Sequence, residues 1–174
     1  QRVYWMLHKP KGVVSATIDK QHATALDLLT GVDKDLLHIA GRLDLNSTGL
    51  LLITNDAKWS QKLMAPESKV IKRYLVTLAN PIDASYIKAF EQGMWFEYEG
   101  ITTQPAKLTV LSQHQAMVEL KEGKYHQIKR MFGRFQNPVI ELHRESVGAI
   151  CLEDDLDQGQ FRALSVSEIN SIYT

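Results

Sequence analysis

The chain has 174 residues, 44% of them hydrophobic, and is long enough to bury a core of its own. Its single cysteine, Cys151, excludes a disulfide framework and a cysteine-rich zinc site, and no apolar run is long enough for a membrane span or a signal peptide. We therefore expect a cytoplasmic protein with no membrane contact. The formal net charge is zero, but residues 121–134 carry five cations against one anion, and residues 153–174 carry five anions against one cation. This segregation favours a selective polyanion binder with a basic working face, although a surface that is merely patchy would give the same counts.

The first half of the chain predicts short strands and helices. Residues 3–8 form a strand, ended by the turn at residues 9–12. A short helix over residues 24–30 stops at a glycine, and residues 50–53 are apolar enough for a strand buried on both faces. A helix over residues 57–64 is capped by Asn55 or Asp56, with Trp59 and Leu63 facing the core.

In the second half of the chain, the predicted strands and helices again follow one another without a regular order. A strand over residues 74–79 precedes a helix from Asp83, in which Ile87, Phe90 and Met94 recur at helical spacing. Residues 105–111 and 116–120 predict a hairpin, and residues 125–135 a basic helix. Strands follow at residues 139–142 and 147–152, and a capping box of Ser165 and Glu168 begins the last helix.

This pattern has no regular β-α-β alternation. It predicts an α+β fold with a mixed, largely antiparallel central sheet and flanking helices. We expect a single domain over residues 1–174, or two lobes that share one sheet. Because the chain starts at Gln1, directly before a strand, we also expect a segment to precede it.

The most informative stretch runs from His38 to Thr54. Gly41 and Gly49 bracket a polar loop that places Arg42 and Asp44 directly before the buried strand, so the acid is held on a rigid edge. A catalytic carboxylate would suit this position. Asp44 would equally suit a cap that accepts a hydrogen bond from a nearby backbone N–H, and the loop alone leaves both interpretations open.

Four motifs occur in order along the chain. They are Lys9-Pro10-Lys11-Gly12, then Gly41-Arg42-Leu43-Asp44 with Ser47 and Gly49, then Lys72-Arg73-Tyr74, then Glu122-Gly123-Lys124-Tyr125-His126-Gln127-Ile128-Lys129-Arg130-Met131-Phe132. Together they resemble the ribosomal RNA pseudouridine synthases over nearly the whole chain. The lysine that follows His-Gln-Ile, Lys129, resembles the pattern of the synthases that act on small-subunit ribosomal RNA. The resemblance implies the same α+β fold, with a catalytic cleft across the sheet. It also implies the isomerisation of a flipped-out uridine to pseudouridine without a cofactor.

The resemblance also implies site residues. Asp44 matches the essential aspartate, Lys129 its basic partner, and Tyr74 the tyrosine that stacks on uracil. Arg42 matches the arginine that takes the place of the departing nucleotide in the RNA. Leu43 and Ile128 would line the pocket. A further set would contact RNA phosphates: Lys9, Lys11, Lys72, Arg73, Lys124, His126, Arg130 and Arg134. His143 and Arg144 are weaker candidates for the same role.

The remaining alternatives are an inactive RNA-binding module of the same fold, or a synthase that acts on large-subunit ribosomal RNA. A glycosidase would need paired carboxylates, and no second acid lies in a matching motif. The six histidines show no metal-binding spacing, so we expect no metal. The expected partner of this monomer is small-subunit ribosomal RNA or a partly assembled small subunit. Members of this group usually carry a small N-terminal RNA-binding module, which we expect to be missing from this fragment.

Overall fold

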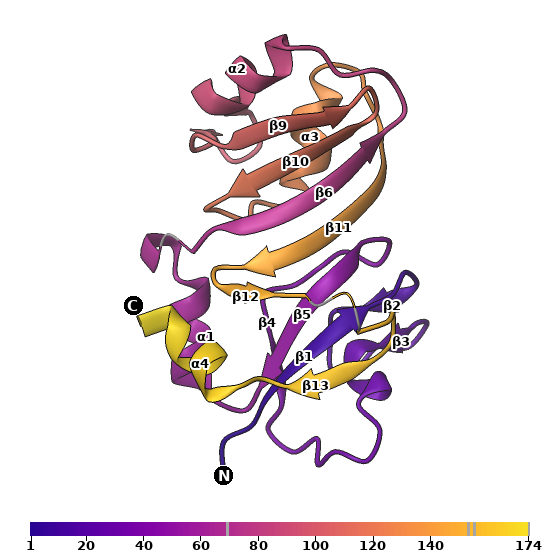
Figure 1. The fold of residues 1–174 in the computed structure, drawn as a ribbon, viewed down its shortest axis with the longest axis vertical. Helices are drawn as coiled ribbons and strands as arrows, with labels where there is room; N and C mark the ends of the chain where they lie inside the picture. Colours follow the sequence, from indigo (N-terminus) through magenta and orange to yellow (C-terminus); the bar gives the residue numbers. More distant parts are fainter. Residues whose placement is uncertain (69, 153, 155, 174) are drawn as a thin grey trace. The chain divides into compact units, whose positions relative to one another are not determined.

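The computed structural model describes residues 1–68, 70–152, 154 and 156–173, which fall into two compact units (Figure 1). Unit 1 comprises Gln1–Val70 and His143–Thr174, and unit 2 comprises Ile71–Leu142. Two acids of the C-terminal segment, Glu153 and Asp155, lie outside the described residues. Within the described residues, no helix is both long enough and apolar enough to cross a membrane.

Unit 1 is built on the order β13-β1-β5-β11, with β4 also paired to β5 and β12 to β11. Its elements are β1 (Tyr4–Lys9), β2 (Val13–Val14), β3 (Ala23–Thr24), the 3-10 helix η1 (Ala25–Leu28), β4 (His38–Ala40), β5 (Thr48–Thr54), α1 (Ala57–Met64), η2 (Pro66–Ser68), the end of β11 (Val139–Val147), β12 (Ile150–Cys151), β13 (Phe161–Ala163), α4 (Val166–Asn170) and η3 (Ser171–Tyr173). Met6, Leu50, Leu52 and Trp59 lie at the centre of its core.

The strand β5 is the inner element of this unit. Leu50, Leu51, Leu52 and Ile53 are all fully buried, because β5 pairs antiparallel with β1 and β4 and parallel with β11. Gly49 is required at the close approach to β11, since its φ is +119° and a Cβ there would lie 2.3 Å from the Arg144 carbonyl oxygen. The parallel pairing of β5 with β11 beside its antiparallel pairings with β1 and β4 confirms the predicted mixed, largely antiparallel sheet.

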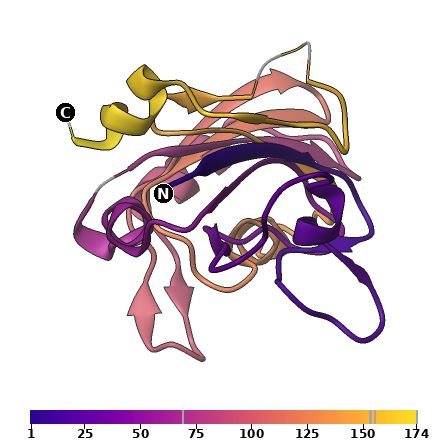
Figure 2. The same cartoon turned by 90° about the horizontal axis from the view of Figure 1, so that it is seen from below.

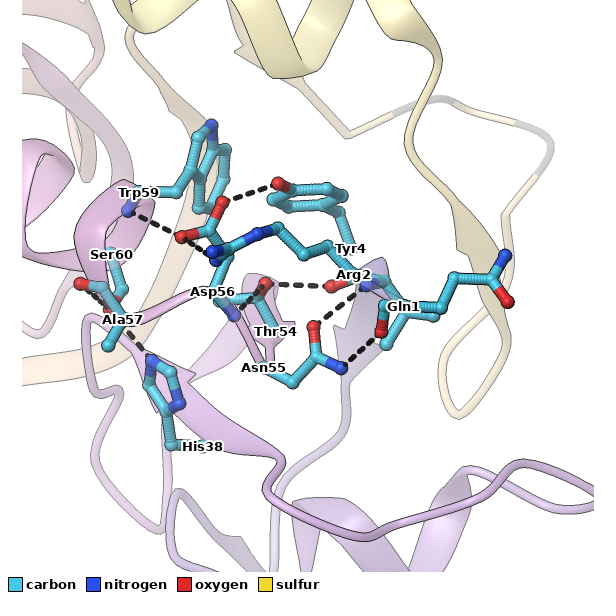
Figure 3. Close-up of polar contacts among 11 residues, drawn as sticks. Gln1, Arg2, Tyr4, His38, Thr54, Asn55, Asp56, Ala57, Trp59 and Ser60 are labelled. Carbon is cyan, nitrogen blue, oxygen red and sulfur yellow. Dashed lines mark hydrogen bonds and ion pairs between the residues drawn. The ribbon is translucent and has the colours of Figure 1, made fainter.

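The first residues of the chain are tied to the start of α1 (Figure 3). Asp56 caps the helix by accepting a hydrogen bond from the Trp59 N–H at 3.1 Å. The same carboxylate accepts the Tyr4 hydroxyl at 2.5 Å and pairs with Arg2 at 2.7 Å. Asn55, the other predicted cap, instead accepts a hydrogen bond from the Val3 N–H at 2.8 Å.

Unit 2 contains the antiparallel order β6-β10-β9 and two helices that pack together through aromatic rings. Its elements are β6 (Lys72–Leu78), α2 (Ser85–Gln92), β7 (Trp95–Phe96), β8 (Ile101–Thr102), β9 (Lys107–Ser112), β10 (Gln115–Leu120), α3 (Gln127–Gly133) and the start of β11. The β7–β8 hairpin stands out from the rest of this unit in Figure 2.

Several element predictions are confirmed, and others differ in type or in extent. Residues 57–64 form α1, the predicted hairpin is β9–β10, and Ser165 and Glu168 make the capping box of α4. The predicted helix over residues 24–30 is only the four-residue η1. The strands predicted at 139–142 and 147–152 are instead one long strand, β11, followed by the short β12. Ile87 remains 39% exposed on α2, whereas Phe90 is fully buried.

Candidate active site

In unit 1 the loop between β4 and β5 presents Asp44 from a tightly held backbone. The Asp44 carbonyl accepts a hydrogen bond from the Ser47 N–H at 3.0 Å, and the Leu45 carbonyl accepts one from the Gly12 N–H at 2.9 Å. The Asp44 side chain is half-buried. A carboxylate in this position is accessible from solvent while its backbone is fixed.

Lys9 lies beneath this loop and is fully buried. Its ammonium donates to the carbonyl oxygens of Leu45 at 3.2 Å and Ser47 at 2.7 Å, and to that of Pro10 at 2.8 Å. The structure disfavours the predicted contact of Lys9 with an RNA phosphate, because its N–H donors are directed at protein carbonyls. Lys9 instead holds the two halves of the loop together.

Burial lowers the pKa of Lys9 to about 8, and the nearby negative charge of Asp44 opposes this shift. The ammonium is thus mostly charged at neutral pH and attracts the Asp44 carboxylate in unit 1. This makes Lys9 a cationic neighbour of Asp44 that the motif comparison had not assigned to that role.

Arg144 is a second buried cation under the same loop, only 2% exposed. Its guanidinium donates to the Leu50 carbonyl from Nε at 3.0 Å and from Nη2 at 2.8 Å, and to the Gly41 carbonyl at 3.1 Å. It therefore connects the last residue before the Arg42–Asp44 segment with the start of β5. Its interpretation as an RNA contact is wrong. Arg144 lies on β11 and pairs with Gly49 of β5.

Ser15 fixes the residue next to Asp44. Its hydroxyl accepts a hydrogen bond from the Leu43 N–H at 3.0 Å and donates to the Leu43 carbonyl at 2.7 Å. The Leu43 side chain is 7% exposed, which fits a predicted wall residue. Arg42 and Lys11, by contrast, are exposed and remain available for RNA.

In unit 2, Tyr74 lies on β6 opposite Val118 and is 9% exposed. Its neighbour Lys72 is half-buried, and the exposed Arg73 forms a 3.4 Å ion pair with Glu119. Lys129 is half-buried on α3. The side chain of Ile128, next to it, is 3% exposed and belongs to the buried face of α3.

The segment before α3 is organised by Gln127, a residue that the sequence analysis did not select. Its side chain is 3% exposed, accepts a hydrogen bond from the Lys124 N–H at 3.0 Å and donates to Glu122 at 2.9 Å. Lys124 itself is exposed, and His126 is half-buried with a left-handed backbone. Both stay candidates for RNA contact.

Arg130 is already engaged within unit 2. It forms a bidentate ion pair with Glu99, with both N···O distances at 2.7 Å, and its guanidinium lies 3.8 Å from the centre of the Phe96 ring. The hydrogen bond from Arg130 lowers the pKa of Glu99. The predicted phosphate contact is not supported for Arg130, because these contacts fasten the β7–β8 hairpin to α3. Arg134 is exposed and donates to the Trp95 carbonyl of the same hairpin.

Among the residues that the structure describes, no group of three or more histidine, cysteine, aspartate or glutamate side chains is arranged to hold a metal ion.

Comparison with known proteins identifies the family. The sequence model described as RNA pseudouridylate synthase matches residues 3–133, which is most of the chain. The chain belongs to this family. The predicted resemblance is thus confirmed, and the four motifs fall on the Lys9 turn, the Asp44 loop, β6 and α3.

Relatives that carry the name ribosomal small subunit pseudouridine synthase A include proteins of Pseudomonas aeruginosa and Escherichia coli K12. The Pseudomonas aeruginosa protein is 50% identical over 169 residues, covering 97% of this chain and 74% of the relative. The Escherichia coli K12 protein is 43% identical, with 97% of this chain and 73% of the relative covered. A solved structure described as a pseudouridylate synthase superposes with a TM-score of 0.94 at 38% identity, over 99% of this chain and 74% of that one.

Proposed function

We propose that the chain isomerises uridine to pseudouridine in small-subunit ribosomal RNA, with Asp44 as the catalytic carboxylate. The relatives named above are small-subunit enzymes, and their similarity extends over nearly the whole chain. The structural observation that carries the proposal is the Asp44 loop, whose backbone is fixed from below by buried Lys9 and Arg144. Such a loop presents a carboxylate in one position, which is what an isomerisation without a cofactor requires.

The reaction breaks the N1–C1′ bond of the uridine and forms a C5–C1′ bond. The proton on C5 is released and N1 gains one, so the product is an isomer of the substrate. The chemistry requires a carboxylate in a fixed position, which the Asp44 loop supplies. The Lys9 ammonium lies below this loop.

Tyr74 and Lys129 are proposed as the further catalytic residues, Tyr74 by stacking on the uracil and Lys129 by supplying positive charge. Arg42, exposed beside Asp44, would occupy the space that the flipped-out uridine leaves in the RNA. The residues proposed to contact phosphates are Lys11, Lys72, Arg73, Lys124, His126 and Arg134. An inactive RNA-binding module is disfavoured, since Asp44, Tyr74 and Lys129 are all present.

We further propose a cytoplasmic monomer that acts on ribosomal RNA, either naked or in a partly assembled small subunit. The lone cysteine is compatible with a reducing compartment. The chain spans about three quarters of the length of the relatives, 74% for the Pseudomonas aeruginosa protein.

The deciding experiment replaces Asp44 by asparagine, which keeps the shape and removes the charge. Tritium release from small-subunit ribosomal RNA labelled at C5 of its uridines should be abolished in Asp44→Asn, while RNA affinity stays within about twofold of wild type. Asp83→Asn makes the same change at an exposed carboxylate before α2 and should release tritium as wild type does. Substantial turnover in Asp44→Asn would refute the assignment.

A further inference from the structure

Two exposed tyrosines in unit 2 have no part in the function proposed so far. Tyr125 is 74% exposed and Tyr98 is 95% exposed. The Tyr125 ring stacks on the His126 ring, with centroids 3.9 Å apart and planes inclined by 19°. A ring stacked on one side and largely exposed to solvent presents a flat aromatic surface for another ring.

The backbone under Tyr125 is fixed although its side chain is exposed. The Arg130 guanidinium donates to the Tyr125 carbonyl at 2.9 Å, and on either side the Lys124 and Gln127 groups are hydrogen-bonded to each other. His126 has φ of +49°, in the left-handed region that few residues other than glycine occupy. A strained residue held in place by its neighbours, beside an exposed aromatic ring, is more typical of a binding surface than of an unconstrained loop.

The chemistry around this ring suits RNA. The exposed Lys121 and Lys124 precede Tyr125, and Glu122, the anion between them, is bound to Gln127. Arg130 bonds to Glu99 as well as to the Tyr125 carbonyl, so the β7–β8 turn is held next to the segment that carries Tyr125. Flat aromatic rings next to lysines match unpaired nucleobases and their phosphates.

We propose that the outer face of Tyr125 stacks on an unpaired base of the RNA close to the target uridine, while Lys124 contacts an adjoining phosphate. This inference rests on the proposed function. Tyr125 lies in the segment that leads into α3, four residues before Lys129 in the sequence, so we place the base it takes near the target uridine. Tyr125 then increases the affinity of the protein for the single-stranded part of the substrate.

Stacking and phosphate contact can be separated by salt, because only the second releases counterions. The probe is a transcript of small-subunit ribosomal RNA that wild type modifies, with its dissociation constant measured by filter binding across a range of KCl. Tyr125→Ala should weaken binding by about 5- to 150-fold at every salt concentration, with an unchanged slope of log K against log[salt]. Lys124→Ala should instead reduce the magnitude of that slope by about 0.7.

Three variants complete the test. Tyr125→Phe keeps the ring and should bind within about twofold of wild type, and Tyr125→Ala should raise KM while kcat at saturating RNA stays near wild type. Tyr173→Ala removes an exposed tyrosine of unit 1 and should leave both unchanged. Only variants whose thermal unfolding midpoint matches that of wild type are compared.

The inference is overturned if Tyr125→Ala binds as wild type, or if Tyr125→Phe is as weak as Tyr125→Ala. It is also overturned if Tyr125→Ala fails only on partly assembled subunits, which would indicate a contact with a ribosomal protein. A wild type that forms no pseudouridine in small-subunit RNA would refute the proposed function itself, an outcome distinct from all of these.

Discussion

Individual side chains that are distant in the sequence stabilise the Asp44 loop by donating hydrogen bonds to its carbonyl groups. Lys9 and Arg144 are both buried, and between them they satisfy the carbonyl groups of Gly41, Leu45, Ser47 and Leu50. Loop carbonyls that point into the protein need a donor, since an unpaired buried carbonyl costs about 1–3 kcal/mol. A long side chain with several N–H groups can serve more than one carbonyl, which explains why two cations are buried here.

The sequence indicated the importance of Lys9 but not its role. A lysine beside proline and glycine in an RNA-modifying family was interpreted as a phosphate contact, and the buried environment of its ammonium depends on the return of the loop 36 residues later. The Arg42-Leu43-Asp44 segment, in contrast, was located from its glycines and the buried strand after it. Local patterns therefore place the Asp44 loop, whereas its supports require the folded chain.

Stability should depend on pH through Lys9. Its pKa is about 8 in the folded chain against 10.5 in the unfolded one, so between these values the unfolded chain holds the proton that the folded chain has lost. Stability from this group therefore rises with pH across that window. The unfolding free energy of wild type minus that of Lys9→Met should rise by up to about 1.4 kcal/mol per pH unit there, measured by urea unfolding.

Lys11→Met is the matched control for this effect, because Lys11 lies two residues further along and is exposed. The difference between wild type and Lys11→Met should not change with pH in the same window. A flat difference for Lys9→Met would contradict the lowered pKa of the buried ammonium.

At the element scale, prediction succeeded where the deciding interactions are local. The bounds of α1 follow from Asp56 at its start and from the spacing of Trp59 and Leu63, and α4 follows from its capping box. It failed for β11, where the polar run of residues 143–146 lies between the two strands predicted at 139–142 and 147–152. That run is strand because β11 pairs with β5 at His143 and Arg144, a contact about 95 residues away in sequence.

At the start of α1, the Asp56 carboxylate connects this helix to β1. Burial raises the pKa of Asp56, but the hydrogen bonds from Tyr4 and Trp59 and the charge of Arg2 outweigh it, so the pKa is lowered. The same contact and burial raise the pKa of Tyr4 to about 12. Asp56 therefore joins β1 to the N-terminus of α1 in its ionised form.

Asp56→Ala should destabilise the protein by about 2 kcal/mol at neutral pH, because it removes a helix cap and leaves the half-buried Tyr4 hydroxyl without its acceptor. A carboxylate with a lowered folded pKa stabilises above its unfolded pKa, and this contribution is lost as pH falls through the folded value. The difference from wild type should thus shrink at acidic pH in thermal unfolding. Asp83→Ala, at the exposed residue before α2, is the control and should destabilise the protein much less. An equal loss in both variants would show that the Tyr4 and Arg2 contacts contribute nothing.

At the scale of the whole molecule, the formal net charge of zero conceals a division of its cations by environment. Lys9 and Arg144 are buried, Arg130 is paired with Glu99, and Lys11, Arg42 and Lys124 are exposed. Sequence counts of positive charge cannot separate these classes, since burial and pairing are set by tertiary contacts. The electrostatic attraction to RNA is then expected to come from the exposed class alone.

This division predicts how RNA binding responds to salt. The logarithm of the affinity for small-subunit ribosomal RNA should fall linearly with the logarithm of the KCl concentration, because each phosphate contact releases counterions. Lys11→Ala and Arg42→Ala should each reduce the magnitude of the slope by about 0.7–0.9. Lys9→Met should leave the slope unchanged even where it weakens binding by loosening the Asp44 loop. A smaller slope in Lys9→Met would mean that its ammonium leaves the loop carbonyls and reaches the RNA, and the structural role assigned to Lys9 would then be wrong.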